Sequence, residues 1–347
     1  MKTDNTFLDK NRLVGDQAAD QLVEGLFKKN KQAELYATFK LTEKEISSLK
    51  KKNLIVTFLL ARRKQPSWYD EKRVLRGQEV FQLYATEIMT LLGAMALPYC
   101  YAASPGNKAL YLSDKMRQSP GKRLLDTAQF IISVSTPGTL ADDKLGHIHI
   151  NKTRLIHAIA RHYVGKANWD IAWGVPINQE DMAGTNLAFS VLILLGLQQS
   201  GHVLSEKQKE DFIFLWHYIG YQLSLDEDLL PATFKEAYHL AQVIKKRNFK
   251  KSEEGVALAK ELLSYFHSVA PSDQARFIDA QVRHFLGPEV SGYIGLEPDY
   301  IKDKVSSLIS SFNELQNLFA VHASSYSAMI ENHRLLKMNL SKTAIGK

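Results

Sequence analysis

The combination of side chains best suited to chemistry in this sequence is Arg154, His157 and Arg161, at spacings of three and four residues. These spacings place all three side chains on one face of an α-helix. A neutral imidazole can bind a metal, and the flanking guanidinium groups can bind anions. That is what a haem with two propionates requires from a helix. The pattern is equally typical of an ordinary histidine beside two solvated arginines.

A second cluster lies upstream, where Arg123 and Thr127 are four residues apart and Asp126 is one position before the threonine. A guanidinium, a hydroxyl and a carboxylate close together could hold or protonate a bound oxygen species. The alternative is a helix start with a local arginine–aspartate pair.

A third cluster is the stripe of Asp181, Thr185 and Phe189, at steps of four on a helix that becomes apolar after Ser190. A threonine on such a face often bonds back to its own helix, so this stripe alone indicates no function.

Other chemistries find little support. His147, His149 and His162 lie close to His157 in the sequence, but their spacing fits no zinc or non-haem iron motif. The glycine-rich nucleotide motifs and the nucleophile elbow of hydrolases are also missing from the sequence.

The composition is that of an ordinary globular protein, with 347 residues, 45% hydrophobic and 23% charged. The single Cys100 excludes an internal disulfide, and its apolar neighbours predict a buried thiol. The N-terminus has no signal-peptide pattern, and the apolar stretch 88–103 is broken by Pro98. We therefore expect a cytoplasmic protein.

The net charge of +7 is concentrated in short basic runs, at 28–31, 50–52, 62–64 and 245–251. Such runs are usually solvated faces, and their functional reading is contact with an anionic membrane surface or with nucleic acid. Stacking aromatics are not interleaved with them, so we expect no nucleic-acid partner and allow a peripheral membrane contact.

The hydrophobic pattern predicts an all-α protein, with capping motifs at Thr42, Asn178 and Ser205 and only one short strand candidate, 53–60, which could equally be helical. We expect an N-terminal helical extension over 1–65 and a single catalytic domain over 66–347. The helices are predicted at 8–29, 32–39, 42–52, 68–97, 120–134, 151–164, 179–199, 205–223, 232–248, 252–268, 272–285 and 298–338.

Taken in order, several segments between about 80 and 245 resemble the family of rubber oxygenases (latex clearing protein) and the MpaB oxygenases of fungal meroterpenoid pathways. The segments that carry the resemblance are Leu92-Gly93, Leu97-Pro98, 122–129, 154–161, 176–185, Phe189-Ser190, 216–221 and 226–231.

The resemblance implies a globin-like helical core with added helices, haem b as the cofactor, and dioxygen-dependent cleavage of a carbon–carbon double bond in an isoprenoid chain. His157 falls on the family's proximal iron ligand, and Arg123 and Thr127 fall on its distal side. Arg154, Arg161 and Thr185 match positions that line the cofactor region.

One departure concerns Asp126, because the rubber oxygenase has a lysine there that can cap the iron. A carboxylate cannot act as the same neutral ligand. This departure therefore weakens the inference of a rubber-like substrate more than the inference of haem binding.

We expect a haem b-dependent oxygenase whose partners are O₂ and a hydrophobic small molecule, with the apolar segments 85–97 and 187–197 as walls of its pocket. The alternatives are a haem-binding or gas-sensing module without turnover, and a helical scaffold that has lost the cofactor.

Overall fold

The computed structural model describes residues 2–49, 53–113, 120–141, 144–167, 169–270 and 272–298, with six further positions between 326 and 333. Within these ranges every regular element is a helix, and the β pairing is confined to an isolated bridge between Ala103 and Phe249. The predicted all-α class is confirmed. Most of the predicted helix 298–338 lies outside the described residues.

The chain begins with a series of short helices and continues with longer ones. The first group comprises α1 (Asn5–Arg12), α2 (Gln17–Lys28), α3 (Gln32–Phe39), α4 (Glu43–Ser48), α5 (Leu54–Leu60), α6 (Glu71–Leu83), α7 (Ala85–Leu91), the π-helical segment η1 (Leu92–Ala96), α8 (Leu97–Tyr101) and α9 (Gly106–Leu112). The second comprises α11 (Pro120–Ser135), α12 (Gly146–Val164), η2 (Ile171–Trp173), α13 (Gln179–Phe189), α14 (Val191–Gln199), α15 (Glu206–Gln222), η3 (Glu227–Leu229), α16 (Phe234–Asn248), α17 (Glu253–Val269) and α18 (Ser272–Tyr293).

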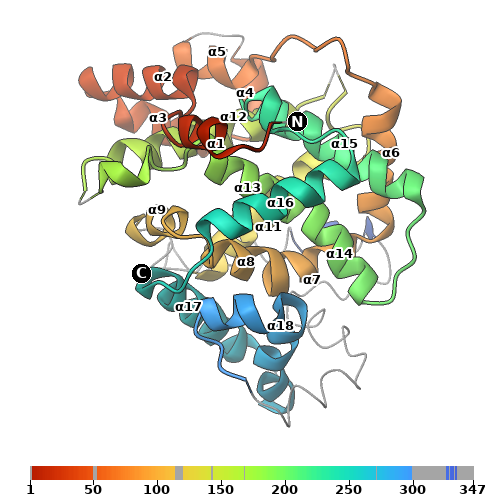
Figure 1. Cartoon of the computed structure of the whole chain (residues 1–347). Coiled ribbons are helices and arrows are strands. Elements are labelled where there is room, and N and C mark those ends of the chain that lie inside the picture. The colour runs from red at the N-terminus through yellow and green to blue at the C-terminus, as the bar shows by residue number, and fades with distance from the viewer. Residues whose placement is uncertain are drawn as a thin grey trace.

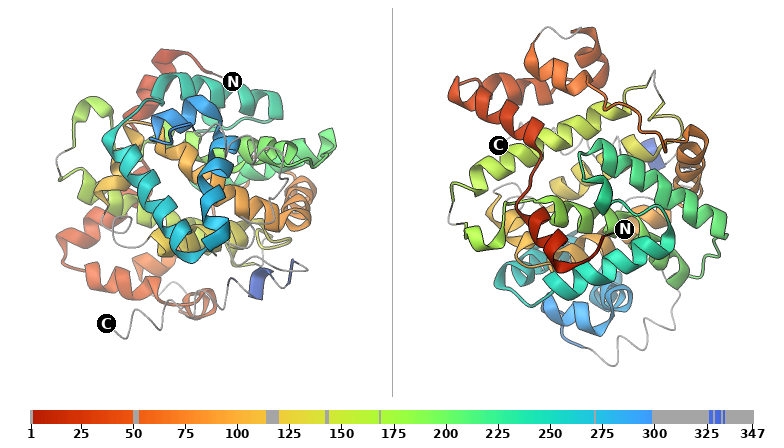
Figure 2. Two further views of the ribbon diagram at one scale, coloured as in Figure 1. Left: turned by 90° about the horizontal axis from the view of Figure 1, so that it is seen from below. Right: turned by 45° about the horizontal axis from the view of Figure 1, so that its top comes forward.

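These helices stack from one end of the molecule to the other (Figure 1). The N-terminal helices α2 to α5 gather at the end where α12 also lies, and α2 and α5 contact α12 directly. Helices α17 and α18 pack together at the opposite end, as the two further views also show (Figure 2). Helices α8, α11 and α13 lie between these ends.

Two hydrophobic clusters form the core, and α12 contributes to both. The larger cluster spans the middle and the far end of the molecule and includes Ile150 of α12. The smaller cluster joins buried residues between positions 19 and 59 to Ile148, Leu155 and Ala158 of α12. Helix α12 is therefore packed on two sides, which fixes the orientation of the side chains that it carries.

The predicted capping motifs are confirmed. Thr42 and Ser205 each form a complete capping box, in which the hydroxyl and the glutamate or glutamine three residues later exchange hydrogen bonds with the backbone. Asn178 accepts a hydrogen bond from the backbone N–H of Asp181 at 3.0 Å. These caps begin α4, α15 and α13 where the sequence places them.

Several predicted boundaries differ from the structure because local caps and kinks divide long apolar patterns. The segment 8–29 is two helices, since Asp16 caps a new one by accepting from the N–H of Ala19. The strand candidate 53–60 is helix α5, which Asn53 caps by accepting from the N–H of Val56 at 2.8 Å. In addition, the predicted helix 179–199 bends at Ser190, whose backbone is not helical (φ −114°, ψ −87°).

One continuous stretch of the described chain, Gln179–Gln199, is long and apolar enough to cross a membrane. Most of it is buried inside the protein, as expected for helices of a folded core. The segments Glu71–Leu83 and Ala85–Tyr101 are long and apolar enough to cross a membrane only if they are taken together. They are bent by 81° relative to each other.

The N-terminal helices are tied to α12 by arginine–carboxylate pairs. Arg154 donates to both carboxylate oxygens of Asp16, from Nε at 2.7 Å and from Nη2 at 3.0 Å, and both side chains are almost fully buried. Arg161 lies two helical turns after Arg154 on α12, and it donates to Asp20 at 2.7 Å. A bidentate buried pair of this kind fixes the orientation of both partners.

We predict that Asp16→Asn lowers the free energy of unfolding by about 3–5 kcal/mol, because it leaves the buried Arg154 charge uncompensated. Asparagine can still cap α2, so the loss reports the ion pair. Asp228→Asn, which removes the exposed partner of Lys2, is the control and should leave the urea midpoint nearly unchanged. Equal, small effects of both substitutions would contradict this account.

Candidate functional site

His157 lies near the middle of α12, and its side chain is partly accessible. Burial lowers its pKa to about 4, and the charges of Arg161 and Arg123 act in the same direction. No hydrogen bond to either ring nitrogen is present among the residues that the structure describes. The imidazole is therefore neutral at pH 7, and its lone pair is available to a ligand.

Arg123 projects from α11 toward the same region of the interior. Burial lowers the pKa of its guanidinium, and its charge acts on Cys100, Tyr101 and His157. Within the described ranges it makes no hydrogen bond or ion pair. A desolvated guanidinium with five donors and no partner is costly, which indicates that these donors serve a bound group.

Helix α8 contributes two residues that the sequence did not single out as functional. Burial raises the pKa of both Cys100 and Tyr101 to about 12, so both side chains are protonated at neutral pH. Thr185 of α13 lies close enough to the thiol to act on its pKa, in the direction opposite to burial. Cys100 was expected to be a buried structural thiol, and no spacing in the sequence connects it with Thr185.

These residues come from α8, α11, α12 and α13, and they lie close enough to influence one another's pKa values. Cys100, Arg123 and His157 are desolvated strongly enough to shift their pKa values, yet each keeps part of its surface accessible. Thr185 is exposed although it adjoins the buried thiol. This combination is expected for side chains that face an interior space rather than the outer surface of the protein.

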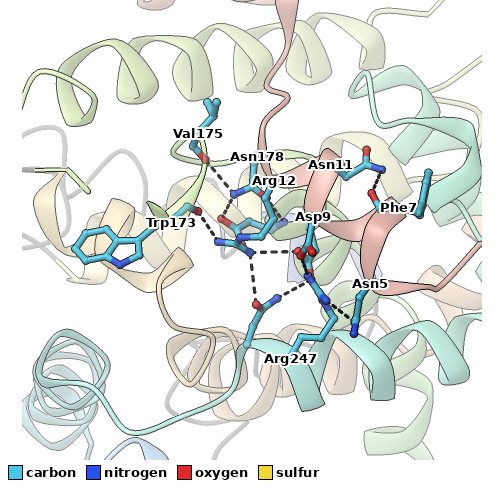
Figure 3. A network of polar contacts seen from close by, with 12 residues as sticks. Asn5, Phe7, Asp9, Asn11, Arg12, Trp173, Val175, Asn178 and Arg247 are labelled. Carbon is cyan, nitrogen blue, oxygen red and sulfur yellow. Dashed lines mark hydrogen bonds and ion pairs between the residues drawn. The ribbon is translucent and has the colours of Figure 1, made fainter. Parts of the chain in front are cut away.

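A network of charges fixes the start of α13 (Figure 3). The fully buried Glu180 accepts from Arg247 at 2.9 Å, from Asn248 at 3.0 Å and from Arg12 at 3.3 Å. Arg12 also donates to Asp181 at 3.2 Å and to the carbonyl of Trp173 at 2.8 Å. Helix α1 thus holds the helix that carries Thr185.

The predicted stripe on α13 is only partly turned toward the interior space. Burial raises the pKa of Asp181 to about 6, Arg12 opposes this rise and Glu180 adds to it. The Asp181 carboxylate is occupied by Arg12 and by Asn178, which donates to it at 2.8 Å. Thr185 bonds back to the carbonyl of Asp181 at 3.0 Å, which is the ordinary role considered for it, and it also reaches Cys100.

The two arginines that flank His157 face the N-terminal helices. Arg154 is occupied by Asp16 and by Asn151, to which it donates at 3.2 Å. Arg161 binds Asp20 and the carbonyl of Ile177, and its Nη2 is buried without a hydrogen-bond partner. Both arginines are therefore engaged in holding the fold, and Arg161 keeps one donor available to a ligand.

The remaining predicted residues occupy different environments. Asp126 is exposed and pairs with Lys122 at 3.3 Å, so the local ion pair at this helix start involves a lysine and not the expected arginine. Thr127 is half-buried, one helical turn after Arg123. His162 packs edge-on against Phe27, with ring centroids 4.6 Å apart, and so points away from His157.

The expected apolar walls of a pocket lie mostly within the core. The ideal Cβ position of Gly196 is only 2.8–2.9 Å from side-chain atoms of Leu91 and Met95, so α14 and the π-helical segment pack directly on each other. Segments 85–97 and 187–197 therefore pack against each other in the core and do not form the walls of a pocket. Near Arg123, apolar lining comes instead from Leu97, Leu124, Leu258 and Leu262.

The donor set fits a haem better than a bare metal ion. The described residues contain no group of three or more histidine, cysteine, aspartate or glutamate side chains that could hold a metal. A haem brings four nitrogen ligands of its own and requires only one neutral imidazole from the protein, which His157 supplies. The unpaired donors of Arg123 and Arg161 are suited to anionic groups.

Comparisons with known proteins identify the fold and the family of this chain. The chain resembles the solved structure titled "Structure of Latex Clearing Protein LCP in the closed state", with a TM-score of 0.71 and 19% identity over 93% of this chain and 91% of that one. At this identity the likeness shows a shared fold. No curated protein sequence matches the chain significantly.

A family model described as "ER-bound oxygenase mpaB/B'/Rubber oxygenase, catalytic domain" matches residues 79–308. The match begins near the end of α6, includes α11, α12 and α13, and extends beyond α18. Because it covers well over half of the sequence, the chain belongs to the family of mpaB and rubber oxygenase catalytic domains.

Proposed function

We propose that this protein is a haem b-dependent oxygenase in which His157 is the axial ligand of the iron. The observation that carries the proposal is a neutral imidazole without a hydrogen bond among the described residues, close to the desolvated guanidinium of Arg123. Membership of an oxygenase family supports the reaction class. When bound, haem supplies the binding of O₂ and the redox chemistry.

The protein side chains around this space have distinct tasks. His157 binds and orients the cofactor, and its depressed pKa keeps it in the ligand form at neutral pH. Arg123 donates to negative charge that develops during the reaction. Thr127, one turn away on α11, orients the reacting groups, while Arg161 and Thr185 line the cofactor region.

The reaction that we propose is cleavage of a carbon–carbon double bond in a hydrophobic, isoprenoid or lipid-like substrate. The two atoms of O₂ become the two carbonyl oxygens of the products, so no further oxidant is required. The exposed Asp126 is no candidate for a distal ligand, and the globin-like description of the core stays a prediction.

His157→Ala should remove most of the bound haem, because His157 carries the only imidazole among the described residues whose pKa shifts are attributed to Arg123. Haem content per chain after reconstitution, and the Soret band, measure the loss. His162→Ala is the matched control, since this imidazole packs against Phe27 and should leave haem content unchanged. A folded His157→Ala variant with full haem content and an unchanged Soret band would show that the assignment is wrong.

Arg123→Gln should reduce oxygen consumption with an isoprenoid probe such as squalene by about 10²–10³-fold, as expected for loss of a charged donor at developing charge. Haem content should stay the same. Arg123→Lys keeps the positive charge but loses the planar guanidinium group. Its rate should therefore lie between those of the wild type and Arg123→Gln. If the wild type binds haem but consumes no oxygen with any such probe, a gas-binding module is the better description.

We further propose that the protein acts in the cytoplasm and contacts anionic membranes peripherally. The excess of basic residues supports this, although parts of the basic runs serve the fold: Arg247 binds Glu180, and Arg63 stacks on Tyr221. A more specific feature is the loop after α12, where Ile171 is 87% exposed between Trp169 and Trp173. An apolar tip flanked by two tryptophans suits a bilayer interface.

Ile171→Asp should weaken co-sedimentation with vesicles of phosphatidylcholine and phosphatidylserine about tenfold, because burial of one isoleucine is worth roughly 1.5–3 kcal/mol. Val203→Asp changes an equally exposed residue in a different loop and should have little effect. Binding that is independent of anionic lipid, or equally impaired in both variants, would contradict the proposed surface.

A further inference from the structure

A buried carboxylate on α17 is not explained by the fold or by the proposed function. Glu261 is partly accessible as a residue, but its Oε2 atom is completely buried and has no hydrogen-bond partner. A carboxylate oxygen that is desolvated without a partner costs several kcal/mol, so such groups are rare in folded proteins. Among the described residues, no protein group supplies the partner that this oxygen requires.

Glu261 shares a small cavity with the guanidinium of Arg123 and with Tyr101. The cavity volume is about 10 Å³. A space of roughly 10–15 Å³ holds one water molecule, provided that two to four polar groups surround it. Arg123 can donate to such a water, Glu261 can accept from it, and the remaining walls are leucines and Pro120.

We propose that this cavity is a binding site for one ordered water that links Glu261 to Arg123, and that Glu261 is a positioning residue for the guanidinium. The link satisfies the orphaned carboxylate oxygen and gives the arginine a compensating negative charge across the cavity. Its consequence for catalysis rests on the proposed function of Arg123, whereas the link itself does not.

The link also assigns a direction to the guanidinium fork. Arg123 acts electrostatically on Cys100 of α8 and on His157 of α12, and neither of these lines the cavity that Arg123 shares with Glu261 of α17. A water-bridged carboxylate holds one edge of the planar fork, so the other edge faces the interior space. Glu261 thereby limits the rotation of the arginine without touching the reacting atoms.

A double-mutant cycle on the full-length protein tests the link, because coupling between two residues is measured independently of turnover. In the wild-type background, Glu261→Gln should raise the unfolding equilibrium constant about tenfold. In the Arg123→Gln background the same substitution should raise it less than threefold, because the positive charge at position 123 is already absent. Glu253→Gln removes an exposed acid from the same helix and should give equal, small effects in both backgrounds. Additive effects of Glu261→Gln and Arg123→Gln would overturn the proposal.

Two further measurements keep the test decisive if a variant folds poorly, and each has an outcome of its own. A high-resolution structure of the wild type should show a water within hydrogen-bond distance of both Glu261 Oε2 and Arg123, and a direct salt bridge or a dry cavity would overturn the proposal. In ¹⁵N spectra, the Nε–H signal of Arg123, identified by its loss in Arg123→Lys, should broaden in Glu261→Gln. An unchanged signal would show that Glu261 does not restrain the guanidinium.

The same variants separate this inference from the proposed function. With haem bound, Glu261→Gln should lower kcat with an isoprenoid probe about tenfold and leave KM and haem content unchanged. If the double-mutant cycle shows coupling but no variant affects turnover, the water site is supported and the proposed role of Arg123 in catalysis is wrong. If turnover changes without coupling, the link is wrong and the proposed function survives.

Discussion

Burial of α12 between two hydrophobic clusters is the constraint on which the rest of this structure depends. The N-terminal helices cover one side of α12 through Ile148, Leu155 and Ala158, and the main core covers another through Ile150. This desolvation keeps His157 neutral, and a neutral imidazole is the form that binds a metal. The N-terminal helices therefore contribute to the chemistry of the site although they lie outside the matched family region.

Charged pairs set the orientation of the helices around this site. Arg154 and Arg161 attach α12 to the N-terminal helices, and Arg12 and Arg247 converge on the carboxylates at the start of α13. Each arginine is paired with a carboxylate, which makes its burial tolerable. Arg123 is different, because its guanidinium lacks such a pair within the described structure and faces the interior space instead. That contrast distinguishes the arginine available for chemistry from those that hold the fold.

The sequence predicts most of the helices, but it does not predict which groups the arginines bind. Caps such as Thr42 and Asn178 are local, so their residues alone determine where the helices begin. The one-face pattern of Arg154, His157 and Arg161 correctly places them on one helix, but it cannot show that Asp16 and Asp20, some 140 residues earlier, reach two of them. Cys100 and Glu261 were missed for the same reason, because only the tertiary packing brings α8 and α17 to Arg123.

The central claim is that His157 binds haem. An absorption spectrum of the protein as purified, combined with a pyridine extraction assay, tests it most directly. The account predicts a Soret band and about one haem b per chain, either as purified or after addition of haem. Protein that stays colourless after reconstitution while remaining folded would contradict it.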